Sequence, residues 1–166
     1  MNIRIAKLEE LQGMVDIYNQ AITAGQKTAD ITPNATDDRK KWFKDHPPDK
    51  YPILVAEEGQ LIVGYLTISA YRPGRMALRH TAEVSFFVHS EHHRQGIATR
   101  LLQYGIDMCP SLQIKTLLAI LIDSNRDSNR LLEKFSFKKW GHMPRVAEFE
   151  GVEVGHLYYG LRIEKC

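Results

Sequence analysis

HHRQGIATRLL, residues 92–102, lies between an apolar segment at 81–88 and a segment of helical periodicity at 98–108. A glycine such as Gly96 lets the backbone approach a ligand without a Cβ in the way. The free N–H groups of a helix's first turn also suit an anion. The stretch therefore predicts a strand-to-helix turn that binds a phosphate or pyrophosphate. An ordinary turn with a solvated arginine is the alternative, and the motif alone favours neither.

Composition fits one globular domain spanning residues 1–166, with 43% hydrophobic and 25% charged residues. The formal net charge of +2 is too small to indicate a nucleic-acid partner. No apolar run has the length of a membrane span, and the N-terminus lacks the apolar core of a signal peptide. Cys109 and Cys166 do not suggest a disulfide framework. We therefore expect a cytoplasmic protein without a membrane partner.

The order of hydrophobic patterns predicts an α/β domain. Its sheet is expected to be antiparallel at first and to gain a parallel pair around the helix at 98–108. Pro33 falls in a polar loop at 25–37, and Pro73 and Gly74 in a loop at 71–78. Expected strands are 2–6, 53–57, 61–69, 81–88 and 115–122, and expected helices are 9–23, 38–44, 98–108 and 125–135. The tail at 137–163 is expected to hold one or two strands around a loop at 146–151.

Two motifs coincide in order and spacing. HRQGIA (93–98) is the first, and the second is Asn125-x-x-Ser128-x-x-Leu131 ending at FSF (135–137). Together they resemble the GNAT superfamily of acetyl-CoA-dependent N-acetyltransferases. The phosphinothricin acetyltransferase branch is similar along most of the chain, in the segments IRIAKLEEL (3–11), IYNQAI (17–22), YPILVAEE (51–58), YRPGR (71–75), TAEVSFFV (81–88) and MPRVAEFEG (143–151). The resemblance implies the GNAT fold, a central mixed and twisted β-sheet flanked by helices.

The resemblance also implies acetyl-CoA as the acetyl donor. In the family, the turn that corresponds to HRQGIA (93–98) forms a cradle that binds the pyrophosphate. The strand before the cradle pairs its backbone with pantetheine, and the Asn-x-x-Ser helix contacts the rest of the cofactor. The N–H of Val88 is then the candidate donor to the oxyanion. The positions carried over as cofactor-binding are Phe86, Phe87, Val88, His93, Arg94, Gln95, Gly96, Ile97, Ala98, Thr99, Asn125, Ser128 and Lys134.

Glu83 stands in the middle of a β-rich run, where carboxylates are poor strand formers and rarely fully buried. An amine nucleophile is protonated at neutral pH, so acetyl transfer needs a base and donors that hold the oxyanion. The matching family strand favours Glu83 as this base, acting directly or through water. A solvent-facing edge position, or a salt bridge to Arg75 or Arg79, is the alternative.

The resemblance implies a small amino-acid-like primary amine as substrate, acetylated by direct attack in a ternary complex. A guanidinium suits the substrate carboxylate, and Arg72 and Arg75 compete for that role. The substrate-binding positions carried over are Arg72, Arg75, Glu83, Val84 and Ser85. A homodimer is also expected from the resemblance. Two alternatives stay open: a non-catalytic acyl-CoA sensor, and a protein or peptide N-acetyltransferase.

Several positions depart from the family's pattern. Leu132 stands where many members have a Tyr, which leaves the proton donor to the thiolate unassigned. Ser136 stands where a Gly is usual, and Glu153 and Gly155 stand where the branch commonly has Trp and Asp. The last two leave the identity of the amine open. Remaining candidates for the proton donor are Tyr104, Tyr158, Tyr159 and a water.

His89, His92 and His93 lie close together in the sequence. Their spacing does not fit a closed tetrahedral zinc site, and no cysteine is near them. We therefore expect no metal.

Overall fold

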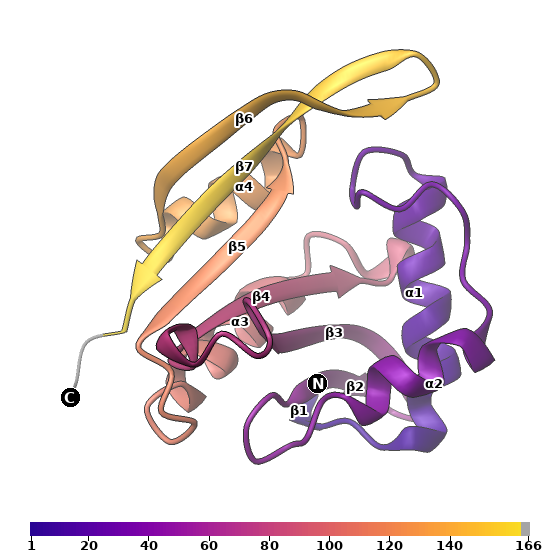
Figure 1. Cartoon of the computed structure of the whole chain (residues 1–166). Helices are drawn as coiled ribbons and strands as arrows, with labels where there is room; N and C mark the ends of the chain where they lie inside the picture. The colour runs from indigo at the N-terminus through magenta and orange to yellow at the C-terminus, as the bar shows by residue number, and fades with distance from the viewer. Residues whose placement is uncertain (164–166) are drawn as a thin grey trace.

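The computed structural model describes residues 1–163. Its seven strands form one sheet in the order β1-β2-β3-β4-β5-β7-β6, with helices on both faces (Figure 1). The strands are β1 (Asn2–Ile5), β2 (Ile53–Glu58), β3 (Leu61–Ala70), β4 (Thr81–Val88), β5 (Thr116–Ile122), β6 (Lys138–Phe149) and β7 (Val152–Arg162). The helices are α1 (Leu11–Thr23), α2 (Thr36–Lys44), α3 (Ile97–Met108) and α4 (Arg126–Lys134). No helix among residues 1–163 is long and apolar enough to cross a membrane.

The sheet is mixed. β4 and β5 run parallel, with α3 in the connection between them, and every other neighbouring pair is antiparallel. This confirms the predicted architecture, including the parallel pair around the helix at 98–108. β5, TLLAILI, is apolar after its first residue, because it lies inside the sheet with most of its side chains buried.

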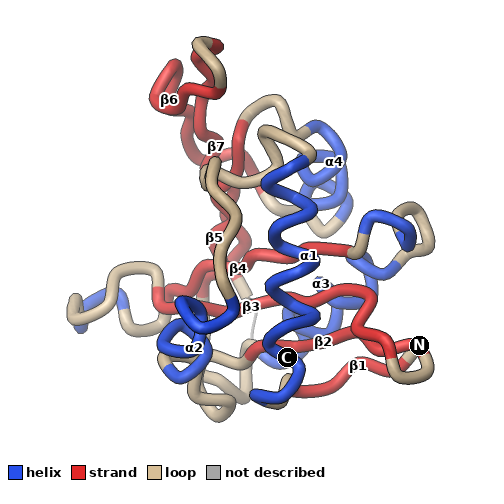
Figure 2. Tube along the Cα trace, turned by 90° about the vertical axis from the view of Figure 1, so that its right-hand side faces the viewer, coloured by secondary structure: helices blue, strands red, loops and turns tan. Residues whose placement is uncertain are grey.

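The helices divide the sheet into two faces. α1 and α2 pack on the front face, where Met14, Ile17 and Tyr65 belong to one buried cluster. α3 and α4 pack on the back face, where Leu101 and Leu132 are fully buried in the second cluster. Figure 2 shows α1 crossing the sheet on one side with α3 behind the strands. Since α1 contacts mainly β3 and β4, and α2 packs on α1, no helix of residues 1–163 covers the front of β5 and β7.

The expected helices and strands are all present, with small shifts at their ends. α2 begins at Thr36, two residues before the expected start. The loop expected at 146–151 is wrong, because β6 continues to Phe149 and only Glu150 and Gly151 form the turn. Both residues have positive φ, 49° and 81°, as in the type I′ turns that close two-residue hairpins. Cys166 and the expected domain end at 166 lie outside the described residues.

The end of α4 explains one departure from the family pattern. Ser136 has a φ of 65°, in the left-handed region that a glycine adopts at lower cost. Its N–H donates to the Glu133 carbonyl at 2.9 Å, and the N–H of Phe137 donates to the Leu132 carbonyl at 3.1 Å. These two bonds make a Schellman motif with buried Phe137 after it. The backbone therefore ends α4 as a glycine would, although the residue is serine.

Candidate active site

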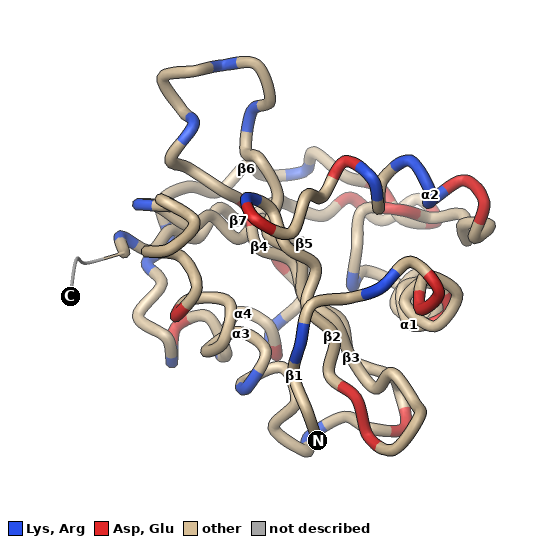
Figure 3. The backbone as a smooth tube through the Cα atoms, turned by 90° about the horizontal axis from the view of Figure 1, so that it is seen from below, with Lys and Arg blue, Asp and Glu red and all other residues tan. Residues whose placement is uncertain are grey.

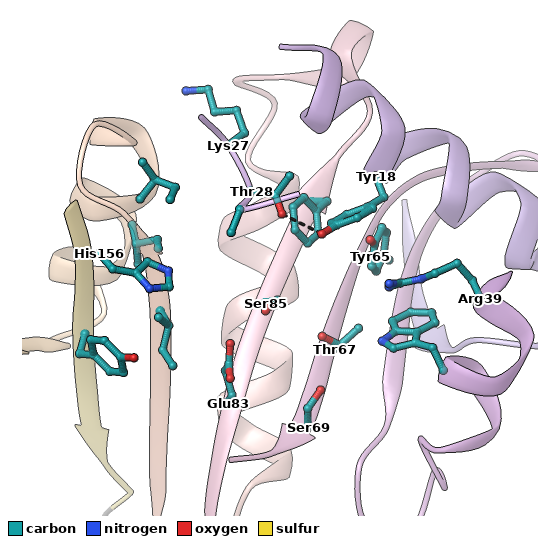
Figure 4. A pocket seen from close by; sticks show the side chains of 17 residues that line it. Tyr18, Lys27, Thr28, Arg39, Tyr65, Thr67, Ser69, Glu83, Ser85 and His156 are labelled. Carbon is teal, nitrogen blue, oxygen red and sulfur yellow. Dashed lines mark hydrogen bonds between the residues drawn. The ribbon is translucent and has the colours of Figure 1, made fainter. Parts of the chain in front are cut away.

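β4 and β5 separate part of the way along the sheet. Their register covers three partner pairs and ends at Glu83 opposite Leu118. β4 nevertheless continues to pair with β3 as far as Val88 opposite Gly64. Figure 4 shows β5 and β7 on one side of the site and β4 and β3 on the other. Glu83 therefore sits where the two parallel strands begin to diverge.

The divergence leaves backbone groups of β4 without a strand partner. The N–H of His89 donates to the Val63 carbonyl at 2.9 Å, so the peptide groups of His89 face β3. Because peptide groups alternate in direction along a strand, those of Phe86 and Val88 face the β5 side instead. No residue of β5 pairs with them in the described part of the chain. The Val88 carbonyl accepts a hydrogen bond from His93 Nε2 at 3.0 Å, and its N–H stays available.

The turn after β4 has the conformation expected of an anion cradle. Gly96 has a φ of 77° and directly precedes α3, and Arg94 has a φ of 60°. A Cβ added at Gly96 would meet nothing within 4 Å, so the space above this residue is open. Ile97 is buried in the back-face core and fixes the start of the helix. The first-turn N–H groups of α3 are left for an external acceptor.

The remaining predicted cofactor positions lie on α3 and α4 or directly before these helices. Ala98 and Thr99 are half-buried in the first turn of α3, while His93 and Gln95 are exposed in the cradle. Asn125 is buried at the start of α4 and Ser128 is half-buried one turn later. Lys134 is exposed at the opposite end of α4, so it is separated from Asn125 by the length of that helix.

A cavity of about 410 Å³ lies on the front face at the divergence of β4 and β5. Glu83, Ser85 and Phe87 line it, because alternate side chains of a strand share a face. The intervening Val84 points to the back face and packs in the core. The other lining residues are Tyr18, Lys27, Thr28, Ala29, Arg39, Trp42, Tyr65, Thr67, Ser69, Ile120, Leu121, Ile122, His156 and Tyr158 (Figure 4).

The structure brings only part of the predicted substrate set together. Glu83 and Ser85 share the cavity, whereas Val84 is buried on the other face. Arg72 and Arg75 are exposed on the loop before β4 and do not line the cavity.

Glu83 is half-buried and carries an uncompensated carboxyl group. Burial raises its pKa above the ordinary value for a glutamate. Among residues 1–163 it forms neither a salt bridge nor a side-chain hydrogen bond, so the expected alternative of a pair with Arg75 or Arg79 is absent. β4 is also flanked by β3 and β5, which rules out the edge position.

The opposite wall of the cavity is formed by β7. His156 and Tyr158 both line it, with their rings 5.8 Å apart in an edge-to-face arrangement. Burial lowers the pKa of His156, and the nearby Asp123 carboxylate opposes this only in part. Among the candidate proton donors, only Tyr158 reaches the cavity: Tyr159 donates to Glu133 at 3.0 Å, and Tyr104 is exposed on α3.

Sequence reasoning missed several titratable groups in this cavity, among them His156 and Arg39. His156 could have been found from the alternation of β7, because it lies two residues before Tyr158 on the same face. Arg39 could not, since it reaches the cavity only through the packing of α2 against α1. Its guanidinium lies 4.2 Å from the centre of the Trp42 ring and 5.1 Å from that of Tyr18.

Comparison with known proteins agrees with this geometry. The sequence model of the acetyltransferase (GNAT) family matches residues 12–137. YwnH of Bacillus subtilis, a provisionally named phosphinothricin acetyltransferase, is 34% identical over 152 residues, which cover 91% of this chain and 92% of that protein. An L-methionine sulfoximine/L-methionine sulfone acetyltransferase of Pseudomonas aeruginosa is 31% identical over 150 residues, covering 89% and 86%.

A solved structure, that of yncA from Salmonella typhimurium with its cofactor acetyl-CoA, superposes with a TM-score of 0.93. It is 26% identical, and the match covers 100% of this chain and 95% of that one. The residues matched by the family model, 12–137, include the cradle before α3 and most of the described chain. The chain therefore belongs to the GNAT family of acetyltransferases, which transfer an acetyl group from acetyl-CoA.

Proposed function

We propose that this chain acetylates the primary amine of a small amino-acid-like substrate, by direct attack of the amine on acetyl-CoA in a ternary complex. One observation carries the proposal. Glu83 is a half-buried carboxyl group that forms no salt bridge within residues 1–163, in a cavity at the divergence of β4 and β5. Burying a charge without a partner costs stability, so its presence is better explained by chemistry than by folding.

The described residues fit acetyl-CoA. The open space over Gly96 and the first-turn N–H groups of α3 suit its pyrophosphate. The peptide groups of Phe86 and the N–H of Val88 are available to the amide groups of its pantetheine arm. Asn125 and Ser128 on α4 are proposed to contact the cofactor as well, and so are the other cradle positions and Lys134. When bound, acetyl-CoA supplies a thioester whose carbonyl carbon is the electrophile.

Residues of the chain would then accept and donate the protons and stabilise the negative charge that forms during transfer. Glu83 accepts a proton from the ammonium group, directly or through water, and its raised pKa brings it closer to the pH at which it must work. The N–H of Val88 donates to the oxygen that gains negative charge. Tyr158 is the proposed proton donor to the departing thiolate, because it alone of the three candidate tyrosines lines the cavity.

Direct transfer is supported by the state of Cys109. It is fully buried, its thiol donates to the Gly105 carbonyl at 3.3 Å, and burial raises its pKa to about 12. Such a thiol is a poor nucleophile. We therefore propose no acetylated enzyme.

The substrate class rests on the cavity and on the relatives. A volume of about 410 Å³ suits a small molecule better than a peptide segment. The Pseudomonas aeruginosa relative is named for methionine sulfoximine and methionine sulfone, which are amino-acid analogues. We propose a small amine rather than a peptide as the acceptor, and a cytoplasmic location.

We also propose that residues 1–166 act as one acetyltransferase domain that forms a homodimer. All seven described strands belong to one sheet, which supports a single domain. The β6–β7 hairpin forms the far edge of that sheet and exposes Trp140, Met143, Val146 and Val152. Light scattering of the purified chain is expected to give twice the monomer mass. A monomer mass at micromolar concentration would contradict the dimer.

The experiment that tests the function compares acetyl-CoA binding with product formation. Calorimetry measures cofactor affinity, and mass spectrometry detects acetylated products from a panel of amino acids, methionine sulfoximine, methionine sulfone and a lysine-containing peptide. Acetylated amino acids are expected. Binding without any product would favour the non-catalytic sensor, and a product from the peptide alone would favour a peptide N-acetyltransferase.

A further inference from the structure

Arg39 is a cation presented to the cavity by two aromatic rings. It lies on α2, with its guanidinium over Trp42 and beside Tyr18. Figure 4 shows the side chain of Arg39 reaching toward the cavity that Thr67 and Glu83 also line. Stacking on aromatic faces fixes the plane of a guanidinium and leaves its N–H edges for hydrogen bonding.

No carboxylate of the described chain neutralises Arg39. The neighbouring basic residues of α2 are paired, Lys40 with Asp37 at 2.6 Å and Lys41 with Asp45 at 2.7 Å. Figure 3 shows acidic and basic residues following one another along this helix. Arg39 forms no ion pair within residues 1–163, although it is half-buried.

Two acidic groups near the cavity do not pair with Arg39 either. Asp30 accepts a hydrogen bond from the hydroxyl of Tyr18 at 2.8 Å rather than pairing with Arg39. Glu83 is the one carboxylate that lines the cavity, and it has no salt bridge in the described residues. The cavity is therefore lined by a half-buried cation from α2, Arg39, by the exposed Lys27 at its rim and by a proton acceptor from β4. Polar side chains of β3 lie between Arg39 and Glu83. Thr67 and Ser69 are these β3 residues, and Ser69 lies opposite Glu83 in the β3–β4 register.

We propose that Arg39 binds the carboxylate of the substrate and thereby turns its amine toward Glu83. The proposal rests on the proposed function, since it assumes acetylation of a small amine in this cavity. A guanidinium fork binds a carboxylate through two parallel charge-assisted hydrogen bonds, which suits an α-amino acid. The enzyme would then select amino acids over amines of the same size that lack a carboxylate. Arg39 lines the cavity, whereas Arg72 and Arg75, the arginines expected to bind the carboxylate, do not.

The test compares L-methionine sulfone with its carboxamide, which keeps the amine and the side chain but removes the negative charge. With the wild type, we expect a KM for the amino acid about 10–100-fold below that for the carboxamide, the range of one charge-assisted pair. Arg39→Gln is expected to remove this difference by raising the KM of the amino acid alone. Arg39→Lys is expected to restore part of it, because the charge returns without the fork.

Three readouts keep the outcomes distinct. Unchanged turnover of the carboxamide by Arg39→Gln shows that the variant is folded and binds acetyl-CoA, so a specific loss for the amino acid supports the proposal. Equal KM values for the two amines with the wild type would overturn the proposal while leaving the acetyltransferase function intact. Arg72→Gln and Arg75→Gln are measured in the same way as Arg39→Gln. If one of these two variants, and not Arg39→Gln, loses the KM difference between the amino acid and the carboxamide, the proposal for Arg39 is also overturned. No product from either amine with the wild type would count against the proposed function itself.

Discussion

Glu83 on β4 and Leu118 on β5 form the last partner pair before the two parallel strands diverge. This relationship places a carboxyl group at the end of the opening in which the peptide groups of Phe86 and Val88 have no partner on β5. Proton acceptor and oxyanion donor then belong to one strand. A rigid strand holds the two at a fixed spacing, as a catalytic site requires.

Replacing Glu83 by Gln is expected to stabilise the protein at neutral pH. A carboxyl whose pKa is raised by folding contributes its stability below the unfolded pKa and loses it as the pH rises through the folded pKa. The wild type therefore carries a cost at pH 7 that an uncharged Gln does not. Urea unfolding at pH 7 and at about pH 4, where an ordinary glutamate begins to protonate, measures the difference.

The expected gain of Glu83→Gln over the wild type is larger at pH 7 than at the lower pH. Glu91→Gln, in the exposed turn after β4, is the control for the loss of one negative charge. An equal gain at both pH values would show that the carboxyl of Glu83 is not destabilised by burial.

The rate of acetyl transfer is expected to rise with pH through the raised pKa of Glu83. Only the ionised carboxylate accepts a proton, so the acid limb of kcat should lie above the range of an exposed glutamate. The profile is measured as the rate of thiol release from acetyl-CoA between pH 5 and 9, with both substrates at saturating concentration. His156 also titrates in the cavity, so His156→Gln is the control. A limb that disappears in His156→Gln but persists in Glu83→Gln would assign it to the histidine.

Gly96→Glu is expected to abolish tight binding of acetyl-CoA. The side chain would enter the open space over the cradle, oppose the pyrophosphate with like charge and strain a backbone that has a φ of 77°. We expect at least a ~100-fold rise in Kd, equivalent to about 3 kcal/mol.

Gly74→Glu is the matched control for this variant. Gly74 has a φ of 79° and equally open surroundings, but it lies on the loop before β4, away from the cradle. Its substitution should strain the backbone and leave the affinity for acetyl-CoA unchanged. Equal losses in the two variants would indicate general destabilisation rather than a cradle at Gly96.

Ser136→Gly is expected to raise the free energy of unfolding by about 1 kcal/mol, because glycine adopts the left-handed conformation at less cost. Ser136→Ala keeps the strain and should give no gain. Denaturant unfolding of the three proteins checks this. A loss of stability in the glycine variant would mean that the serine hydroxyl, rather than the backbone, matters at this position.

Much of the fold follows from local patterns. The apolar run of β5 and the glycine before α3 each depend on neighbouring residues, and both were predicted. The length of β6 was not predicted. The polar residues around Glu150 suggested a longer loop, whereas two residues are enough to connect β6 to β7. In the candidate site, Glu83 was predicted from its unusual place in a strand, and it lines the cavity.

The cavity walls depend on contacts between distant segments. Arg39 reaches Tyr18 only because α2 packs on α1, and sequence spacing carries no signal of that packing. Val84 was predicted beside its neighbours on β4, yet the alternation of the strand turns its side chain into the opposite core.

Glu83 is proposed to remove the proton from an amine that attacks acetyl-CoA. Thiol release from acetyl-CoA, measured with a panel of amino acids for the wild type and for Glu83→Gln, is the decisive measurement. We expect release with the wild type and a kcat lower by about 10²–10⁴-fold in Glu83→Gln, with the affinity for acetyl-CoA unchanged. Equal turnover by the two proteins would contradict the role of Glu83.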